Sequence, residues 1–324
     1  MKLNEIKGHE RPISILLNSL KTNRLACSYL FVGPSGIGKA GVAKYLSSVL
    51  NCEKNNFEAC GKCLSCQKIE NANHPDVHWI VSDTSGFIKI EQVRGLSREI
   101  NLKPFEARAK VFIILDVQNL TEEASNCLLK TLEEPPFGSL IILTTSQIKR
   151  LSPTLISRCL RIVFSGIHPE ILKDILVREY NQGEDISHYL SYFYEGRLGK
   201  TLSFINANVM KDKNQIINNF TNLSNAVFLD DSMLGDKQKV REALLILIYW
   251  FRDIMLLKLG IDLSYLVNCD RKKDLLMLQG RYSIAEVINA LKDIINTNIF
   301  LEQNLNLKIT LSLLREKLCK EKFM

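Results

Sequence analysis

Residues Tyr29-Leu30-Phe31-Val32-Gly33-Pro34-Ser35-Gly36-Ile37-Gly38-Lys39-Ala40 decide the fold of this chain. The four apolar residues are typical of a buried strand, and the next eight match the phosphate-binding pattern G-x-x-x-x-G-K-[ST] except at the last position. In that pattern backbone N–H groups cradle phosphate oxygens, the lysine reaches the terminal phosphates, and the final hydroxyl ligates magnesium. Alanine offers no hydroxyl. The sequence therefore predicts a nucleotide-shaped loop, formed by Gly33, Gly36, Gly38 and Lys39, that lacks one magnesium ligand.

Length and composition set the broad class of protein. A chain of 324 residues exceeds the size at which one hydrophobic core stops growing, so two or three domains are expected. The longest apolar run, 243–251, is far shorter than the roughly 20 residues that cross a bilayer, and the N-terminal residues lack the apolar segment of a signal peptide. These features favour a cytoplasmic protein with no membrane partner. A net charge of +7 permits nucleic-acid contact without arguing for it.

Four of the nine cysteines lie close together in the sequence, at Cys52, Cys60, Cys63 and Cys66. The spacing C-x7-C-x2-C-x2-C can place four thiolates around one zinc ion at about 2.3 Å each. Free thiols or one redox-active C-x-x-C pair are the alternatives, but in a reducing compartment such a cluster is more often a metal site than a disulfide framework. We expect a structural zinc module at 52–66, because four thiolates leave no open position for a catalytic water.

Apolar strands alternate with helices in the first half of the chain. Strands are expected at 29–32, 77–81, 111–115 and 140–144, and helices at 11–20, 39–50, 90–100, 122–132 and 153–156. Strands that are apolar throughout and separated by helices indicate a parallel sheet covered on both faces. This is the doubly wound α/β architecture of nucleotide-binding domains.

The second half of the chain has a helical pattern. Helices are expected at 169–180, 186–194 and 199–206 and, after a polar stretch at 211–214, at 215–229, 240–259, 283–296 and 301–320. The run at 243–251 is apolar around more than one helical face, which suits a helix buried among several others. The polar stretch separates two helical domains in this interpretation.

Three further motifs occur in the first half: His74-Pro75-Asp76, the segment N-C-L-L-K-T-L-E-E-P-P at 126–136, and Ser157-Arg158-Cys159. With the P-loop and the cysteine cluster, they make the chain resemble the AAA+ clamp-loader subunits of bacterial DNA polymerase III, most closely the delta-prime type. The resemblance covers essentially all of the first domain and continues more weakly into the helical half. It implies an AAA+ domain at 1–165 with the zinc insertion, a small helical lid at 166–210 and a helical collar at 211–324.

The resemblance also implies that catalytic groups are missing. The family places a magnesium-binding aspartate and a catalytic glutamate at the end of the strand expected at 110–116, and these positions fall on Leu115 and Asp116. Leucine cannot bind a metal, so two magnesium ligands are absent together, here and at Ala40. We therefore expect no ATPase activity. Lys39 and the glycines can still hold a nucleotide, or the loop serves only as a turn between strand and helix.

Two other family positions bear on the nucleotide site. Active members carry a G-x-x-R-x-A-L pattern in the second domain, and Gly199 stands where its arginine would be, with Arg197 and Lys200 close by. Thr144 and Thr145 match the family's polar sensor position.

The S-R-C triplet is where this family carries an arginine that acts on a neighbouring subunit's ATPase site, so the resemblance implies this role for Arg158; a local salt bridge is the alternative. The function implied is that of a non-hydrolysing, delta-prime-like stator. Its partners would be gamma/tau-like ATPases, a delta-like subunit and, through the complex, the sliding clamp and primed DNA.

Two alternative functions are weighed against the stator. An active gamma/tau-like ATPase motor is disfavoured by Ala40 and Leu115. A zinc-containing DNA-binding adapter would use basic residues that are interleaved with acidic ones, so they are as well explained by a solvated face. These residues are Lys89, Arg94, Arg98, Lys103, Arg108 and Lys110.

Overall fold

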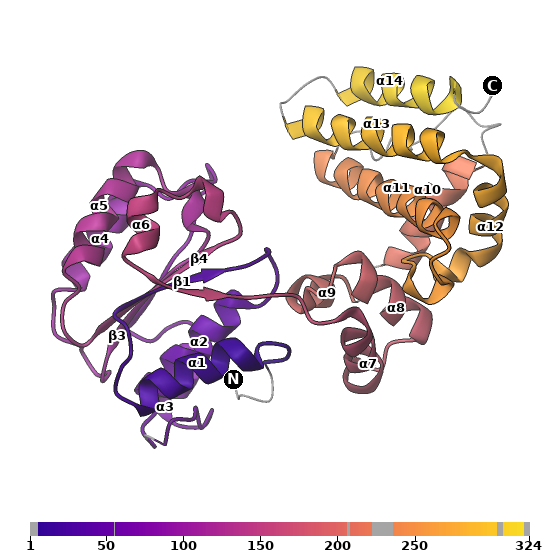
Figure 1. The fold of residues 1–324 in the computed structure, drawn as a ribbon. Helices are drawn as coiled ribbons and strands as arrows, with labels where there is room; N and C mark the ends of the chain where they lie inside the picture. The colour runs from indigo at the N-terminus through magenta and orange to yellow at the C-terminus, as the bar shows by residue number, and fades with distance from the viewer. Residues whose placement is uncertain (1–5, 55, 206–207, 222–235, 303–306, 321–324) are drawn as a thin grey trace. The chain divides into compact units, whose positions relative to one another are not determined.

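The computed structural model describes residues 6–54, 56–205, 208–221, 236–302 and 307–320. The chain divides into two compact units, Met1–His168 with Gly196–Leu202, and Pro169–Glu195 with Ser203–Met324 (Figure 1). The division into three domains with boundaries near 165 and 210 stays a prediction. Among the described residues, none of the helices combines the length and the apolar character needed to cross a membrane.

The first unit contains a five-stranded parallel sheet in the order β2-β3-β4-β1-β5. Its strands are β1 (Ser28–Val32), β2 (Val77–Ile80), β3 (Lys110–Ile114), β4 (Ser139–Thr145) and β5 (Leu160–Val163). Four of them were predicted. The strand β5 was not predicted, because it is an edge strand in which only Ile162 is buried and it shows no continuous apolar run.

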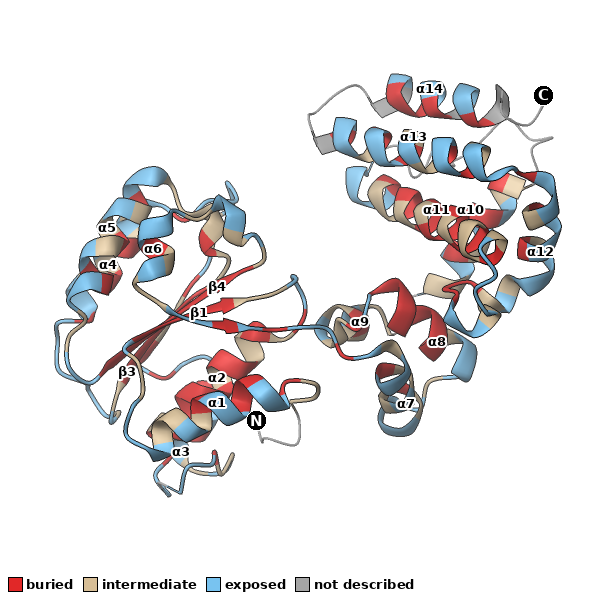
Figure 2. Cartoon of the chain, in the orientation of Figure 1, coloured by how far each residue is buried: buried red, intermediate tan, exposed pale blue. Residues whose placement is uncertain are grey.

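Helices cover both faces of this sheet, as predicted. They are α1 (Glu10–Lys21), α2 (Lys39–Asn51), α3 (Leu64–Glu70), α4 (Ile90–Glu99), α5 (Glu122–Glu133) and α6 (Pro153–Ser157). On one face α1, α2 and α3 bury residues against alternate strand positions such as Phe31 and Ile113. On the other face α4, α5 and α6 pack on the positions between them, such as Leu30 and Phe112. The central strands are consequently buried on both sides (Figure 2).

The second unit is helical among its described residues. Its helices are α7 (Pro169–Tyr180), α8 (Glu184–Phe193), α10 (Val209–Thr221), α11 (Lys237–Lys258), α12 (Lys272–Arg281), α13 (Ile284–Glu302) and α14 (Leu307–Lys320). α9 (Leu198–Phe204) begins in the first unit and ends in the second. The prediction that 243–251 belongs to a buried helix is confirmed, since α11 has most of its large apolar residues buried and packs on α10, α12 and α13 (Figure 2).

Two elements of this half differ from the prediction. The helix expected from 215 begins earlier, because the polar stretch 211–214 lies inside α10, where Lys213 is fully buried and its Nζ lies 2.6 Å from Asp270. α12 was not predicted, because its exposed leucine and methionine blur the helical pattern. Parts of the helices expected at 215–229 and 301–320, namely 222–229 and 303–306, lie outside the described residues.

Candidate functional site

The P-loop connects β1 to α2 and has the backbone that its glycines predict. Gly36 and Gly38 have φ values of +74° and +115°, which L-residues with a side chain rarely adopt, and α2 begins at Lys39. Lys39 is 6% exposed, and its Nζ donates to Gly33 O at 2.6 Å and to Pro34 O at 2.8 Å. The structure thus brings together Gly33, Gly36, Gly38 and Lys39.

The two predicted metal-ligand positions are apolar in the structure. Ala40 follows Lys39 in the first turn of α2, and Leu115 packs against the hydrophobic cluster between the sheet and α2. Asp116 follows Leu115 in a left-handed conformation with φ of 52°. Burial lowers the pKa of Lys39, and the negative charge of Asp116 partly offsets this effect. Among the described residues, no cluster of three or more metal-ligating side chains forms at the P-loop.

The polar residues beside the loop form a hydrogen-bonded network. The Asp116 N–H donates to Thr144 Oγ1 at 3.0 Å, and Thr145 Oγ1 donates to Gln118 Oε1 at 2.7 Å. Gln118 Nε2 lies 3.2 Å from both Asp116 Oδ1 and Ser146 Oγ. The two threonines were predicted from the sequence, but Gln118 was not, because its one signal is that of a polar residue closely following a buried strand.

His9 also braces the loop and was missed. Its Nε2 lies 2.7 Å from Ile37 O, where the carbonyl can only accept, so Nε2 carries the proton. The ring is 2% exposed and packs edge-on against Phe164. A lone histidine near the start of a helix carries no pattern that predicts this role.

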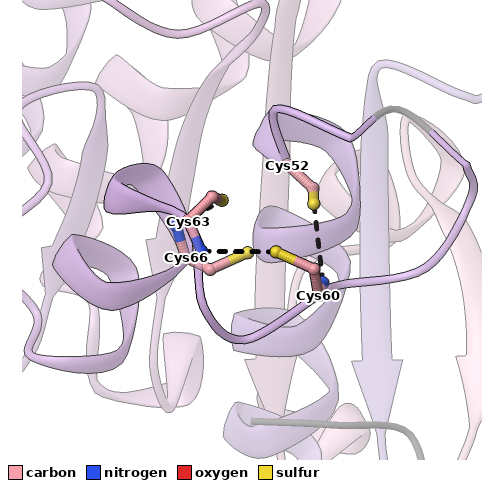
Figure 3. Close-up of side chains that lie close together, drawn as sticks. All are labelled: Cys52, Cys60, Cys63 and Cys66. Atoms are coloured by element: carbon pink, nitrogen blue, oxygen red, sulfur yellow. Dashed lines mark hydrogen bonds between the residues drawn. The ribbon is translucent and has the colours of Figure 1, made fainter.

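The four clustered cysteines converge from separate local elements. Cys52 follows the last residue of α2, Cys60 lies in the connecting loop, and Cys63 and Cys66 lie at the start of α3 (Figure 3). Their four Sγ atoms all lie within 4.8 Å of one another. Such a set of sulfurs fits the closed tetrahedral ligand set that zinc prefers.

Backbone N–H groups point at these sulfurs. Cys60 Sγ accepts from Cys63 N at 3.3 Å and from Lys62 N at 3.5 Å, and these donors lower the pKa of the Cys60 thiol to about 6. Burial raises the pKa of the Cys66 thiol, so a bound cation is what would hold all four sulfurs as thiolates.

The His74-Pro75-Asp76 motif has a structural role beside this module. The Asp76 carboxylate is 1% exposed and accepts hydrogen bonds from three consecutive N–H groups, of Phe105, Glu106 and Ala107, at 2.8 to 2.9 Å. The same loop is tied to α3 by the ion pair of Lys68 with Glu106 at 2.7 Å. The motif therefore fixes the loop that leads into β3.

Arg158 caps the C-terminal end of α6 and is engaged within its own chain. Its Nη2 lies 2.6 Å from Glu133 Oε1, at the end of α5, and its Nη1 donates to Thr154 O at 2.9 Å. The side chain is 30% exposed and that of Glu133 is 49% exposed. The local salt bridge, which was the alternative role for Arg158, is thus present at a solvent-accessible position.

Half of the basic residues of the adapter hypothesis make contacts within the chain. Lys89 pairs with Asp83 at 2.7 Å, Lys110 is 5% exposed with its Nζ donating to Glu99 O, and Arg108 donates to Glu53 O. The others, Arg94, Arg98 and Lys103, are exposed. This arrangement lends the adapter no specific support.

Two family models match the chain. One, described as "DNA polymerase III, delta subunit", matches residues 8–168, and the other, described as "DNA polymerase III, delta subunit, C terminal", matches residues 207–316. Together the two matches span most of the chain.

Individual relatives agree with these matches. DNA polymerase III subunit delta' of Bacillus subtilis is 35% identical over 178 residues, which are 55% of this chain and 53% of that protein. Subunit tau/gamma of Haemophilus influenzae is 34% identical over 239 residues, which are 72% of this chain and 34% of that protein. The matched part of the chain spans about half of the first relative and about a third of the second.

A solved structure shows the same fold. The gamma subunit-related protein of DNA polymerase III from Thermotoga maritima aligns over 95% of this chain and 99% of its own, with a TM-score of 0.50 and 17% identity. From the family models and the curated relatives, we conclude that the chain belongs to the clamp-loader family of DNA polymerase III.

Proposed function

We propose that this protein is a non-hydrolysing, delta-prime-like stator of the clamp loader, which offers Arg158 to the ATPase site of a neighbouring subunit while a sliding clamp is loaded onto primed DNA. The observation that carries the proposal is the chemistry of the two metal positions. The P-loop keeps its lysine and its glycine backbone, but Ala40 and Leu115 are apolar, and the partly buried Leu115 packs against the core.

Magnesium and positioned donors provide most of the transition-state stabilisation in phosphoryl transfer. A P-loop without a hydroxyl or carboxylate ligand for the ion loses that contribution even if nucleotide phosphates reach Lys39. Asp116, the remaining acid at the end of β3, takes part in the network of Gln118 and Thr144. A chain built in this way contributes to the complex as a scaffold.

The state of Arg158 is compatible with a role in trans. Ion pairs between solvent-accessible side chains are worth about 0–1 kcal/mol, so exchanging Glu133 for a nucleotide phosphate in a neighbour costs little. An arginine finger contributes roughly 10³ to 10⁵ in rate in phosphoryl-transfer enzymes. We propose that Glu133 holds the Arg158 guanidinium in place until a neighbouring subunit presents its ATPase site to it.

The remaining parts of the proposal concern the metal and the partners. The Cys52, Cys60, Cys63 and Cys66 set would hold one structural zinc ion. The helical C-terminal region would form the collar that assembles with gamma/tau-like ATPases and a delta-like subunit, in the cytoplasm. The clamp and DNA would be reached through the complex.

A second candidate, an ATP-hydrolysing motor of the same complex, is favoured by the 34% identity to a tau/gamma subunit over 72% of this chain. Turnover by the isolated full-length chain separates the two. The stator hydrolyses no ATP above background with magnesium and primed DNA. Steady hydrolysis that disappears in Lys39→Ala identifies the motor instead.

A further inference from the structure

The first turn of α9 is hydrogen-bonded to the P-loop. The Lys200 N–H donates to Gly36 O at 3.0 Å, and just before the helix Gly196 O accepts from the Ile167 N–H, also at 3.0 Å. Residues Gly196–Leu202 belong to the same compact unit as the P-loop. The segment is therefore anchored at two points within that unit.

The Lys200 bond satisfies a group that the helix itself leaves open. The first N–H groups of an α-helix have no acceptor inside the helix, and Lys200 is in the first turn of α9 (Leu198–Phe204). The next residue, Thr201, already donates to Arg197 O at 2.9 Å. The Gly36 carbonyl thus supplies the acceptor that the Lys200 N–H requires.

Two glycines make this close approach feasible. A Cβ atom on Gly199 would lie 2.7 Å from Gly36 O, and one on Gly36 would lie 2.9 Å from the Lys200 Cβ. Neither position tolerates a side chain unless the backbone moves. The arginine that the family pattern places at position 199 would push the helix away from the loop, so the loss of that arginine and the contact are physically linked.

We propose that the P-loop of this chain serves as an internal latch, in which Gly36 and Gly199 hold the first turn of α9 against the loop whether or not a nucleotide is present. An arginine at position 199 would connect this segment to nucleotide phosphates, whereas glycine connects it to the loop itself. The latch rests on the proposed function in one respect, since it takes the loop not to be a hydrolytic site. The latch gives Gly36 and Gly199 a structural role that requires no magnesium ligand at the P-loop.

Amide hydrogen exchange of the full-length protein tests the latch, with and without Mg-ATP. In the wild-type chain the Lys200 N–H should exchange at least about tenfold more slowly than in Gly199→Ala, a factor that corresponds to ~1.4 kcal/mol. Adding Mg-ATP should leave the wild-type rate unchanged. Alanine is a better helix former than glycine by about 1 kcal/mol, so helix propensity alone predicts slower exchange in the variant, the opposite sign.

Gly280→Ala is the matched control. Gly280 is a helical glycine in α12, and a Cβ atom there meets nothing within 4 Å. This variant should leave exchange at Lys200 as in the wild type. If Gly199→Ala does not fold, Lys200→Pro removes the donor at a first-turn position where proline is tolerated, and exchange at the Ile167 N–H should rise at least about tenfold.

Two results would overturn the latch: equal exchange at Lys200 in the wild type and in Gly199→Ala, or protection that appears only when Mg-ATP is added. Should neither Gly199→Ala nor Lys200→Pro fold, the wild-type comparison with and without Mg-ATP still decides. Failure of the proposed function looks different. Hydrolysis of ATP by a chain with a protected Lys200 contradicts the stator and leaves the latch standing, whereas an unprotected Lys200 without hydrolysis contradicts the latch alone.

Discussion

Arg158 Nη2 lies 2.6 Å from Glu133 Oε1, so the arginine proposed to act on a neighbour is held by the last residue of α5 in its own chain. Both residues belong to motifs that carry the family resemblance, the L-L-K-T-L-E-E-P-P segment and the S-R-C triplet. The ion pair links these two motifs in space. Its exposure makes it a positioning contact of small energetic weight.

The first prediction concerns the contribution of this ion pair to the free energy of unfolding. Glu133→Gln should change the free energy of unfolding by no more than about 1 kcal/mol, because the ion pair is accessible to solvent. Denaturation of the isolated chain in urea measures the change. A loss of several kcal/mol would show that the pair is a structural element, and Arg158 would then not be available to a partner.

The cysteine cluster gives the second prediction. Because four sulfurs close the coordination shell, elemental analysis of the purified chain should find one zinc per molecule, and chelation should increase hydrogen exchange at 51–68 while the sheet stays protected. Cys63→Ser should have the same effect as chelation. The solitary Cys27, which is exposed, provides the control substitution. Metal-free protein with four freely reactive thiols is the contrary result.

Asp76 predicts a dependence of stability on pH. Burial on its own would raise the pKa of this carboxyl, but the N–H donors of Phe105, Glu106 and Ala107 bring the net pKa below its ordinary value. A lowered folded-state pKa contributes stability that is present above the ordinary value of about 3.9 and is lost as the pH falls through the folded-state pKa. Asp76→Asn should therefore cost about 1.5–3 kcal/mol at pH 7.

The pH series provides the check on this assignment. The difference in unfolding free energy between wild type and Asp76→Asn should stay constant from pH 7 to about pH 5 and shrink only at more acidic pH. A difference that grows as the pH falls would mean that Asp76 is protonated in the folded protein at neutral pH.

Lys213 and Asp270 give the fourth prediction. Lys213 is fully buried, its Nζ lies 2.6 and 2.7 Å from the two carboxylate oxygens of Asp270, and its ammonium stands over the ring of Tyr189 at 4.6 Å from the centroid. Lys213→Met leaves the acid without a partner and should cost about 3–5 kcal/mol. Adding Asp270→Leu should recover part of that loss, as measured by a double-mutant cycle. Two single losses that simply add would show that the pair is not coupled.

The sequence allowed the α/β unit to be predicted because its signals are local. The apolar runs of β1, β3 and β4 and the glycine pattern before α2 each depend on neighbouring residues only. The edge strand β5 escaped detection because an edge buries too few residues to form a run. The helical character of 211–214 was missed for a related reason: Lys213 is polar in sequence, but its partner Asp270 is remote along the chain.

In the candidate site, too, the features with local sequence signals were predicted and the contacts between remote residues were not. The P-loop residues and the cysteine cluster were predictable from spacing, and the structure brings both sets together. The contacts of Gly36 with Lys200 and of Ile37 with His9 join segments that are far apart in the sequence. The spacing of residues along the chain therefore could not predict them. The ion pair of Arg158 could be weighed only as an alternative, because Glu133 is one of many acids in the chain.

Clamp loading by the reconstituted complex tests the central claim most directly. The wild-type or Arg158→Ala chain is assembled with its partner ATPases, clamp and primed DNA, and Arg161→Ala, an exposed arginine on β5, serves as the matched control. If Arg158 completes a neighbour's site, Arg158→Ala should assemble normally and reduce the loading rate well over tenfold, while Arg161→Ala loads as the wild type does. Unchanged loading by an assembled Arg158→Ala complex would contradict the trans-acting role and leave this protein as a purely structural subunit.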